Sequence, residues 1–110
     1  MNTKIKFTYK DTPYVLEYDR NIISTLEEAG FSVKEFVNAP MKNVNLAFKG
    51  AFLKNHRKTK DSVIDEIYDN MKDKEKLINT LITMIDECYA TLFDENDDEG
   101  NIEWDTVDLK

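Results

Sequence analysis

Two residues of this chain have side chains suited to nucleophilic catalysis, the single histidine His56 and the single cysteine Cys88. A cysteine–histidine nucleophile requires hydrogen-bond contact between the two side chains and a third group that orients the histidine. Cys88 instead falls on an apolar helical stripe, where a buried and unreactive thiol is the usual outcome. His56 follows a predicted helix beside Arg57 and Lys58, where cations complement the helix dipole. We therefore expect a non-enzymatic protein.

Metal and phosphate binding have little support in the sequence. One cysteine and one histidine cannot complete a tetrahedral zinc site, and the glycines Gly30, Gly50 and Gly100 are too isolated to form a phosphate-binding loop. The acidic run that starts at Asp94 has the oxygen-rich character of a calcium loop. However, Glu99 stands where that loop needs glycine, and Asp105 stands where it needs a bidentate glutamate. We expect no metal and no cofactor.

The acidic residues are concentrated at the C-terminal end. Residues 94–110 contain eight acidic residues and one basic residue, whereas residues 1–93 contain fourteen of each. The acidic segment also holds the only tryptophan, Trp104, among apolar residues spaced along it: Ile102, Val107 and Leu109. Because like charges repel and stay solvated, this pattern predicts one domain over 1–93 and a flexible acidic tail over 94–110 that binds a partner. The net charge of −7 disfavours nonspecific binding to nucleic acid or to acidic membranes.

Length and apolar pattern indicate a small soluble protein. With 110 residues, the chain fits a single domain that has a modest core. No apolar run approaches the roughly 18 residues of a membrane span, and the first residues lack the apolar region of a signal peptide. The single cysteine cannot form an internal disulfide, which suits a reducing compartment. We expect a cytoplasmic protein.

The predicted fold is α+β, an N-terminal β-hairpin packed on a mainly α-helical domain of four to five helices. Alternating apolar residues before and after the turn segment Lys10–Pro13 predict the hairpin. Asp19 and Asp73 have the residue type and position of helix N-caps, Gly30 that of a C-cap, and Ser32 that of a capping box. Together with helical apolar spacing, these signals predict helices over about 20–29, 32–37, 40–56, 60–71 and 74–93.

An apolar stripe at helical spacing is usually part of the core, but this chain has many large apolar side chains for its size. If a stripe is longer than the body can cover, its uncovered part forms a patch for a partner helix. The flexible side chains of Met41, Met71 and Met84 suit such an adaptable surface. The candidate binding residues are Phe48, Phe52, Tyr89, Phe93, Ile102 and Trp104.

Basic residues cluster around the end of the predicted third helix. They are Lys49, Lys54, Arg57, Lys58 and Lys60. No aromatic residue alternates with them in a way that would stack nucleic-acid bases, so a solvated helix end is the simplest interpretation. A second interpretation is that the cluster holds the acidic tail of its own chain or of a neighbouring copy.

Five segments have the order and spacing of a known family. They are KIKFTYKDTPYVLEYD (4–19), LEEAGFSVKEF (26–36), FKGAFLKNH (48–56), VIDEIYDNM (63–71) and GNIEW (100–104). Through them, and the last three above all, the chain resembles the small phage and prophage tail assembly chaperones of long-tailed phages of Gram-positive bacteria. The resemblance covers nearly the full length of the chain.

This resemblance implies a chaperone that binds the tape-measure protein and keeps it soluble until the major tail protein polymerises around it. The major tail protein is then a possible second partner. If the tail of one copy inserts in the next copy, self-association produces an open helical array. An alternative function is an acidic DNA-mimic inhibitor of a host defence nuclease, of the anti-restriction or anti-CRISPR type. A mimic usually spreads its carboxylates over a folded surface, whereas here they lie together in one segment.

Overall fold

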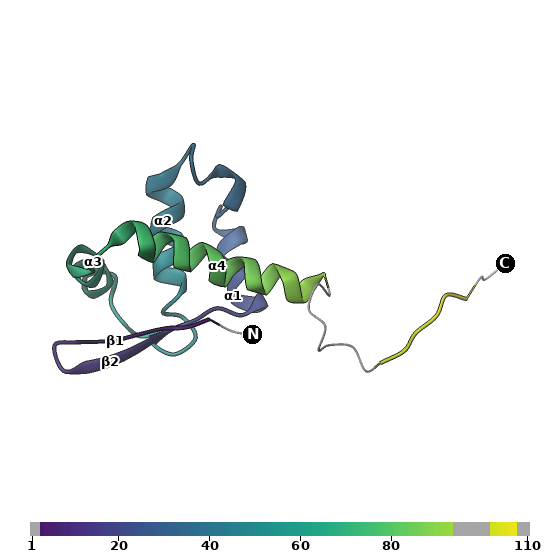
Figure 1. Ribbon diagram of the computed structural model, residues 1–110, viewed down its shortest axis with the longest axis horizontal. Helices are drawn as coiled ribbons and strands as arrows, with labels where there is room; N and C mark the ends of the chain where they lie inside the picture. The colour runs from purple at the N-terminus through teal and green to yellow at the C-terminus, as the bar shows by residue number, and fades with distance from the viewer. Residues whose placement is uncertain (1–2, 94–101, 108–110) are drawn as a thin grey trace.

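In the computed structural model, which describes residues 3–93 and 102–107, an antiparallel hairpin precedes four α-helices (Figure 1). This confirms the predicted α+β class. The elements are β1 (Ile5–Tyr9), β2 (Thr12–Leu16), α1 (Arg20–Glu28), the 3₁₀ helix η1 (Val33–Glu35), α2 (Pro40–Gly50), α3 (Asp61–Asn70) and α4 (Lys74–Leu92). The flexible acidic tail predicted over 94–110 and the calcium-like run from Asp94 lie outside the described residues, apart from 102–107.

The hairpin reverses through two residues with left-handed backbones, Lys10 (φ 49°) and Asp11 (φ 66°). Positive φ at both central residues suits a two-residue hairpin turn, whose twist matches that of the strands. The turn is therefore shorter than the predicted Lys10–Pro13 segment, and Pro13 belongs to β2, opposite Thr8. The predicted apolar face of β2 is confirmed, because Tyr14 and Leu16 are buried.

The outer edge of β2 is covered by the segment that follows α2. The Val15 amide donates to His56 Nε2 at 2.9 Å, and Asn55 Nδ2 donates to the Val15 carbonyl at 3.1 Å. The Glu17 amide donates to the Ala51 carbonyl at 3.2 Å. These groups replace the third strand that this edge lacks. The His56 side chain thus contacts the edge of β2 and does not cap the end of a helix as predicted.

The predicted caps are confirmed for α1 and α4. The Asp19 carboxylate accepts from the Ile22 amide at 2.9 Å, and the Asp73 carboxylate accepts from the Lys76 amide at 3.2 Å. Gly30 has φ 100°, the left-handed conformation that follows many helices.

The capping box predicted at Ser32 does not form. The Ser32 side chain makes no capping hydrogen bond, and the short helix that follows is 3₁₀ rather than α. The Ser32 amide donates instead to Asn43 Oδ1 at 2.9 Å, so a side chain of α2 holds this segment. A tertiary contact thus replaces the local cap.

α2 ends at Gly50, before the end predicted at His56, and residues 51–55 form turns. The turns bring Ala51 and Phe52 into the core, and place Asn55 and His56 against β2. A helix that continued to His56 would leave the backbone groups at the edge of β2 without these hydrogen-bond partners. This explains why α2 ends earlier than the apolar periodicity predicts.

One apolar core joins the hairpin to all four α-helices, and α4 crosses over α1 and α2 (Figure 1). Met84, whose flexible side chain was predicted to suit an adaptable surface, is only 2% exposed and belongs to this core. This prediction was wrong because α1 and α2 both pack against α4.

Gly50 lets α1 and α2 approach closely, as its small size predicts. A Cβ atom at this position would lie 2.7 Å from Cδ2 of Leu26, which is itself buried. We expect Gly50→Ala to lower the free energy of unfolding by about 1–2 kcal/mol, because overpacking outweighs the gain in helix propensity. Urea unfolding measures this, and Leu26→Ala should cost less in the Gly50→Ala background than alone. A stabilised Gly50→Ala variant would contradict the close approach.

Candidate functional site

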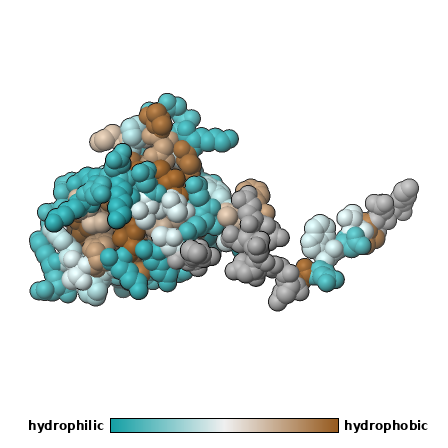
Figure 2. All heavy atoms as spheres, viewed as in Figure 1, coloured by the Kyte–Doolittle hydropathy of each residue, from teal (hydrophilic) through white to brown (hydrophobic). Residues whose placement is uncertain are grey.

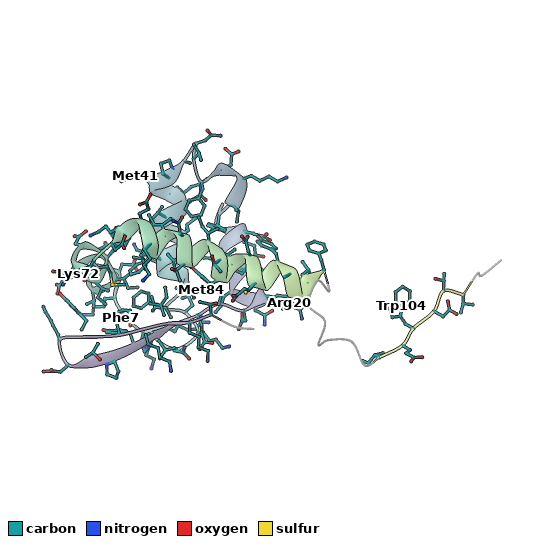
Figure 3. All side chains as sticks on the ribbon, in the orientation of Figure 1. Phe7, Arg20, Met41, Lys72, Met84 and Trp104 are labelled. Atoms are coloured by element: carbon teal, nitrogen blue, oxygen red, sulfur yellow. The ribbon has the colours of Figure 1, made fainter. Side chains whose placement is uncertain are left out.

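An apolar groove of about 760 Å³ lies between α2 and α3. Its lining comes from the first three turns of α2 and the middle and second half of α3: Pro40, Met41, Lys42, Val44, Asn45, Phe48, Asp65, Tyr68 and Asp69. Met41 is 88% exposed at one end, where Figure 3 labels it, whereas Phe48 is 2% exposed and forms the floor. The groove thus has a rigid base and a flexible apolar edge.

The floor of the groove is held by aromatic packing between the two helices. The Phe48 and Tyr68 rings meet edge to face, with 5.2 Å between centroids, and Phe48 also packs edge to face on Phe52 at 5.2 Å. Lys74 Nζ lies 5.5 Å from the centre of the Tyr68 ring. Because each ring packs against its own partners, the floor of the groove is preformed before a ligand binds.

The wall on the α3 side is acidic. Asp65 and Asp69 are exposed on the same side of α3 and line the groove, opposite Lys42. Lys49 Nζ partly offsets this charge, since it lies 3.9 Å from Asp65 and 3.5 Å from Asp61. An apolar base with carboxylates along one side favours an amphipathic helix whose polar side carries lysine or arginine.

A second group of exposed apolar residues continues the groove towards the start of α2. Val37, in the segment between η1 and α2, is 88% exposed, as is Met41 one turn further along the chain. Figure 2 shows hydrophobic residues gathered at this projecting end of the molecule. Large apolar side chains that stay in water in a group are typical of a docking surface.

Two of the predicted binding residues belong to the core. Phe52 is 1% exposed and packs on Tyr14 and Phe48, so it is not available to a partner in this conformation. Phe48 contributes only the floor of the groove. Phe52 is buried because the chain turns after Gly50 and directs this ring inward.

The other predicted residues lie away from the groove. Tyr89 is half-buried on α4, and its hydroxyl donates to Glu27 at 2.6 Å. Burial, and then the Glu27 carboxylate, raise the pKa of Tyr89 to about 12. Phe93 is 66% exposed just after α4, and Ile102 and Trp104 are 82% and 84% exposed. The structure therefore does not bring the six candidates into one site.

Sequence reasoning missed most of the groove. It singled out Met41 for its flexibility but did not consider Tyr68, Asp65 or Asp69 as binding residues. The acidic pair at a helical spacing on α3, beside an apolar stripe on α2, was the available signal. It required knowing that α2 and α3 are neighbours.

His56 and Cys88, the two side chains considered for catalysis, lie in different segments of the chain and make packing or hydrogen-bond contacts there. His56 contacts Val15, Tyr14 and Phe52, whereas Cys88 lies on α4. Burial, followed by the charge of Asp19, raises the pKa of the Cys88 thiol and so disfavours the thiolate. In residues 3–93 and 102–107, no group of three or more potential ligand side chains is placed to hold a metal ion.

Comparison with known families identifies the chain. The model of DUF5055, a domain family of unknown function, matches residues 1–108. The chain belongs to the DUF5055 family. The match includes the groove, the hairpin and the segment 102–107, so all of these are parts of the DUF5055 domain. Neither the curated proteins nor the solved structures include a match to this chain. Within the described part of the chain, no helix is both long and apolar enough to cross a membrane.

Proposed function

We propose that this chain is a phage tail assembly chaperone that binds the tape-measure protein in the cytoplasm of a bacterial host. The observation that carries the proposal is the apolar groove between α2 and α3, bordered by Asp65 and Asp69. The sequence resemblance to tail assembly chaperones supports the same conclusion independently. A tape-measure protein is a long helical chain, and a groove of this kind accepts one amphipathic helix at a time.

Each contact in such a groove is modest, which suits a chaperone. A long helix offers many non-identical stretches, and the flexible side chain of Met41 adapts to different residues in the ligand. Many weak contacts along one chain give a stable coat, while each copy is still displaced when the major tail protein arrives. The acidic C-terminal segment keeps a crowded coat soluble.

Co-expression with the tape-measure protein of the same phage or prophage tests the proposal. We expect the wild-type chain to keep that partner soluble and to be recovered with it in many copies. We expect Met41→Asp to lower the recovered soluble partner about tenfold, because a charge at an exposed apolar edge opposes burial of a helix. Asp69→Lys should also lower the recovery of soluble partner, and the loss should be larger at low salt than at high salt.

The matched control is Trp104→Ser, which removes an exposed apolar side chain from outside the groove. It should leave the capture of a single tape-measure segment unchanged. A tape measure that stays insoluble while the wild-type chain remains free would exclude the chaperone. In that event, competition with DNA for a defence nuclease becomes the next experiment.

A further inference from the structure

The outer edge of β1 presents backbone groups that no residue in 3–93 or 102–107 pairs in a ladder. The amide and carbonyl of Val15 both bond away from β1, so Val15 and its partner Lys6 form a pair without mutual hydrogen bonds. In such a pair, the backbone groups of both residues point out of the ladder. The backbone amide and carbonyl of Lys6 therefore point outward from β1. Because the pattern repeats every two residues, the same holds for the backbone groups of Lys4 and Thr8. In the part of the chain that the structure describes, β1 pairs with β2 alone.

Pro13 supports this assignment. It lies opposite Thr8 in β2, at a position where the backbone nitrogen faces away from β1. A proline lacks an amide proton and is tolerated only where the ladder needs none. The two strands thus differ, since the edge of β2 is covered by residues 51–56 and the edge of β1 is open.

The apolar face of the hairpin is incompletely covered on the β1 side. Tyr14 and Leu16 of β2 are 8% and 0% exposed, whereas Ile5, Phe7 and Tyr9 of β1 point to the same side and remain half-buried. A third strand next to β1 would complete this face. Two-stranded sheets are only marginally stable, so a further strand also stabilises the hairpin.

Residues 102–107 have the pattern of the strand that β1 lacks. Their sequence, IEWDTV, alternates apolar Ile102 and Trp104 with acidic Glu103 and Asp105. The side chains of Ile102 and Trp104 are 82% and 84% exposed, and Figure 3 shows the Trp104 ring standing out from an extended backbone. In a strand, the apolar pair would face one side and the acidic pair the other.

The two patterns are complementary in charge as well as in shape. When Ile102 and Trp104 continue the apolar face of β1, Glu103 and Asp105 lie on the side of Lys4 and Lys6. Lys6 forms no ion pair with any residue in 3–93 or 102–107, and Lys4 lies 3.6 Å from Glu17. Lysines on an open edge normally prevent uncontrolled pairing, and here they select an acidic strand.

We propose that the open edge of β1 binds residues 102–107 of a second copy of this chain as an added antiparallel β-strand. The second copy is favoured over the same chain because, in the described residues, 102–107 form no ladder with β1 of their own chain. The side chains of Ile102 and Trp104 also stay exposed there, so they remain available to another copy.

This contact joins the edge of one copy to the tail of the next. Such a heterologous contact leaves one edge and one tail free at the ends of the assembly, so it produces an open chain of copies rather than a closed dimer. Self-association through this contact does not require a tape-measure protein. The binding site for the tail is the hairpin edge and not the basic cluster around Arg57.

Sedimentation equilibrium of the full-length chain over a range of concentrations tests the proposal, with the emission of Trp104 as a second reading. Trp104 is the only tryptophan, so its burial at an edge shifts the emission to the blue. We expect self-association and a blue shift that both increase with concentration. Trp104→Ser should weaken self-association by about tenfold or more, as truncation of a central aromatic anchor does.

A pair of variants tests the direction of the exchange. Lys6→Pro removes the outward amide of β1 but keeps the tail, whereas Trp104→Ser keeps the edge but weakens the tail. We expect each variant alone to remain monomeric at concentrations where the wild type associates. Mixed together, they should form a one-to-one complex and nothing larger. If Lys6→Pro does not fold by circular dichroism, Lys6→Glu replaces it, since it opposes an acidic strand without changing the backbone.

Met41→Ser is the matched control, because it removes an equally exposed apolar side chain from the α2–α3 groove. Its self-association should equal that of the wild type. A wild-type chain that is monomeric at every concentration would overturn the proposal. So would a blue-shifted Trp104 emission that is independent of concentration, since this shows the tail on its own β1 edge.

Discussion

Replacing Phe52 with alanine should lower the free energy of unfolding by about 3–5 kcal/mol. The ring is 1% exposed and has edge-to-face contacts with Tyr14 at 5.8 Å and with Phe48 at 5.2 Å. Alanine leaves a cavity where the hairpin, the end of α2 and the turn before α3 meet. Because a domain of this size is stable by roughly 5–15 kcal/mol, the loss is a large fraction of the total.

Urea unfolding followed by circular dichroism measures this loss by linear extrapolation. Met41→Ala is the control, since a side chain 88% exposed should change the stability by no more than about 0.5 kcal/mol. A loss below about 1 kcal/mol for Phe52→Ala would mean that the ring is not tightly packed. Phe52 would then return as a candidate partner contact.

Replacing Asn43 with alanine should lower the free energy of unfolding by about 2–4 kcal/mol. Asn43 is completely buried, and its side chain makes three hydrogen bonds. Oδ1 accepts from the Ser32 amide at 2.9 Å, while Nδ2 donates to the carbonyls of Glu35 at 3.2 Å and Ala39 at 3.0 Å. Alanine leaves the amide of Ser32 and the carbonyl of Glu35 without this partner.

Two further variants separate lost hydrogen bonds from lost volume. Asn45→Ala, two residues along the same helix and exposed, should be nearly neutral. Asn43→Asp keeps the acceptor for Ser32 but directs a carboxylate at two carbonyl oxygens, so it should be least harmful at acidic pH, where the carboxyl group is neutral. Equal losses for Asn43→Asp at pH 4 and pH 7 would contradict the assigned bonding pattern.

The loss of Asn43 also reaches the candidate site. Its three bonds tie the start of α2 to the segment 32–39, which carries Val37 and precedes Met41. Without these hydrogen bonds, the apolar edge of the groove loses its fixed position relative to Phe48 at the floor. We therefore expect Asn43→Ala to weaken partner capture at temperatures where the domain is still folded.

The hairpin and the helix caps follow from residues close together in the chain. Alternating side chains from Ile5 to Leu16 define the two strands, because a strand exposes its faces with a period of two wherever it lies. The carboxylates of Asp19 and Asp73 accept from backbone amides three residues further along the chain, and Gly30 acts through its own left-handed backbone. These roles are local, so they could be predicted without tertiary information. The α+β class was predictable for the same reason.

The candidate site was only partly predictable. The flexible, exposed Met41 was identified from its residue type, and the exposure of Ile102 and Trp104 agrees with their place in an acidic segment. The sequence pattern did not distinguish Phe48 and Phe52, which are buried, from Phe93, which is exposed. All three lie on apolar stripes of the predicted helices, and burial depends on which neighbouring element covers each part of a stripe.

The sequence by itself thus determined the class of the fold, the neutral body with its acidic C-terminal segment, and the ends of α1 and α4, since each depends on local patterns or on composition. Only the tertiary structure decided that α2 stops at Gly50, that Met84 and Phe52 are core residues, and that Asn43 is buried. It also decided that the edge of β2 is covered, whereas no described residue pairs with the outer edge of β1. These outcomes depend on contacts between segments far apart in the chain, where packing and hydrogen bonding outweigh local preference.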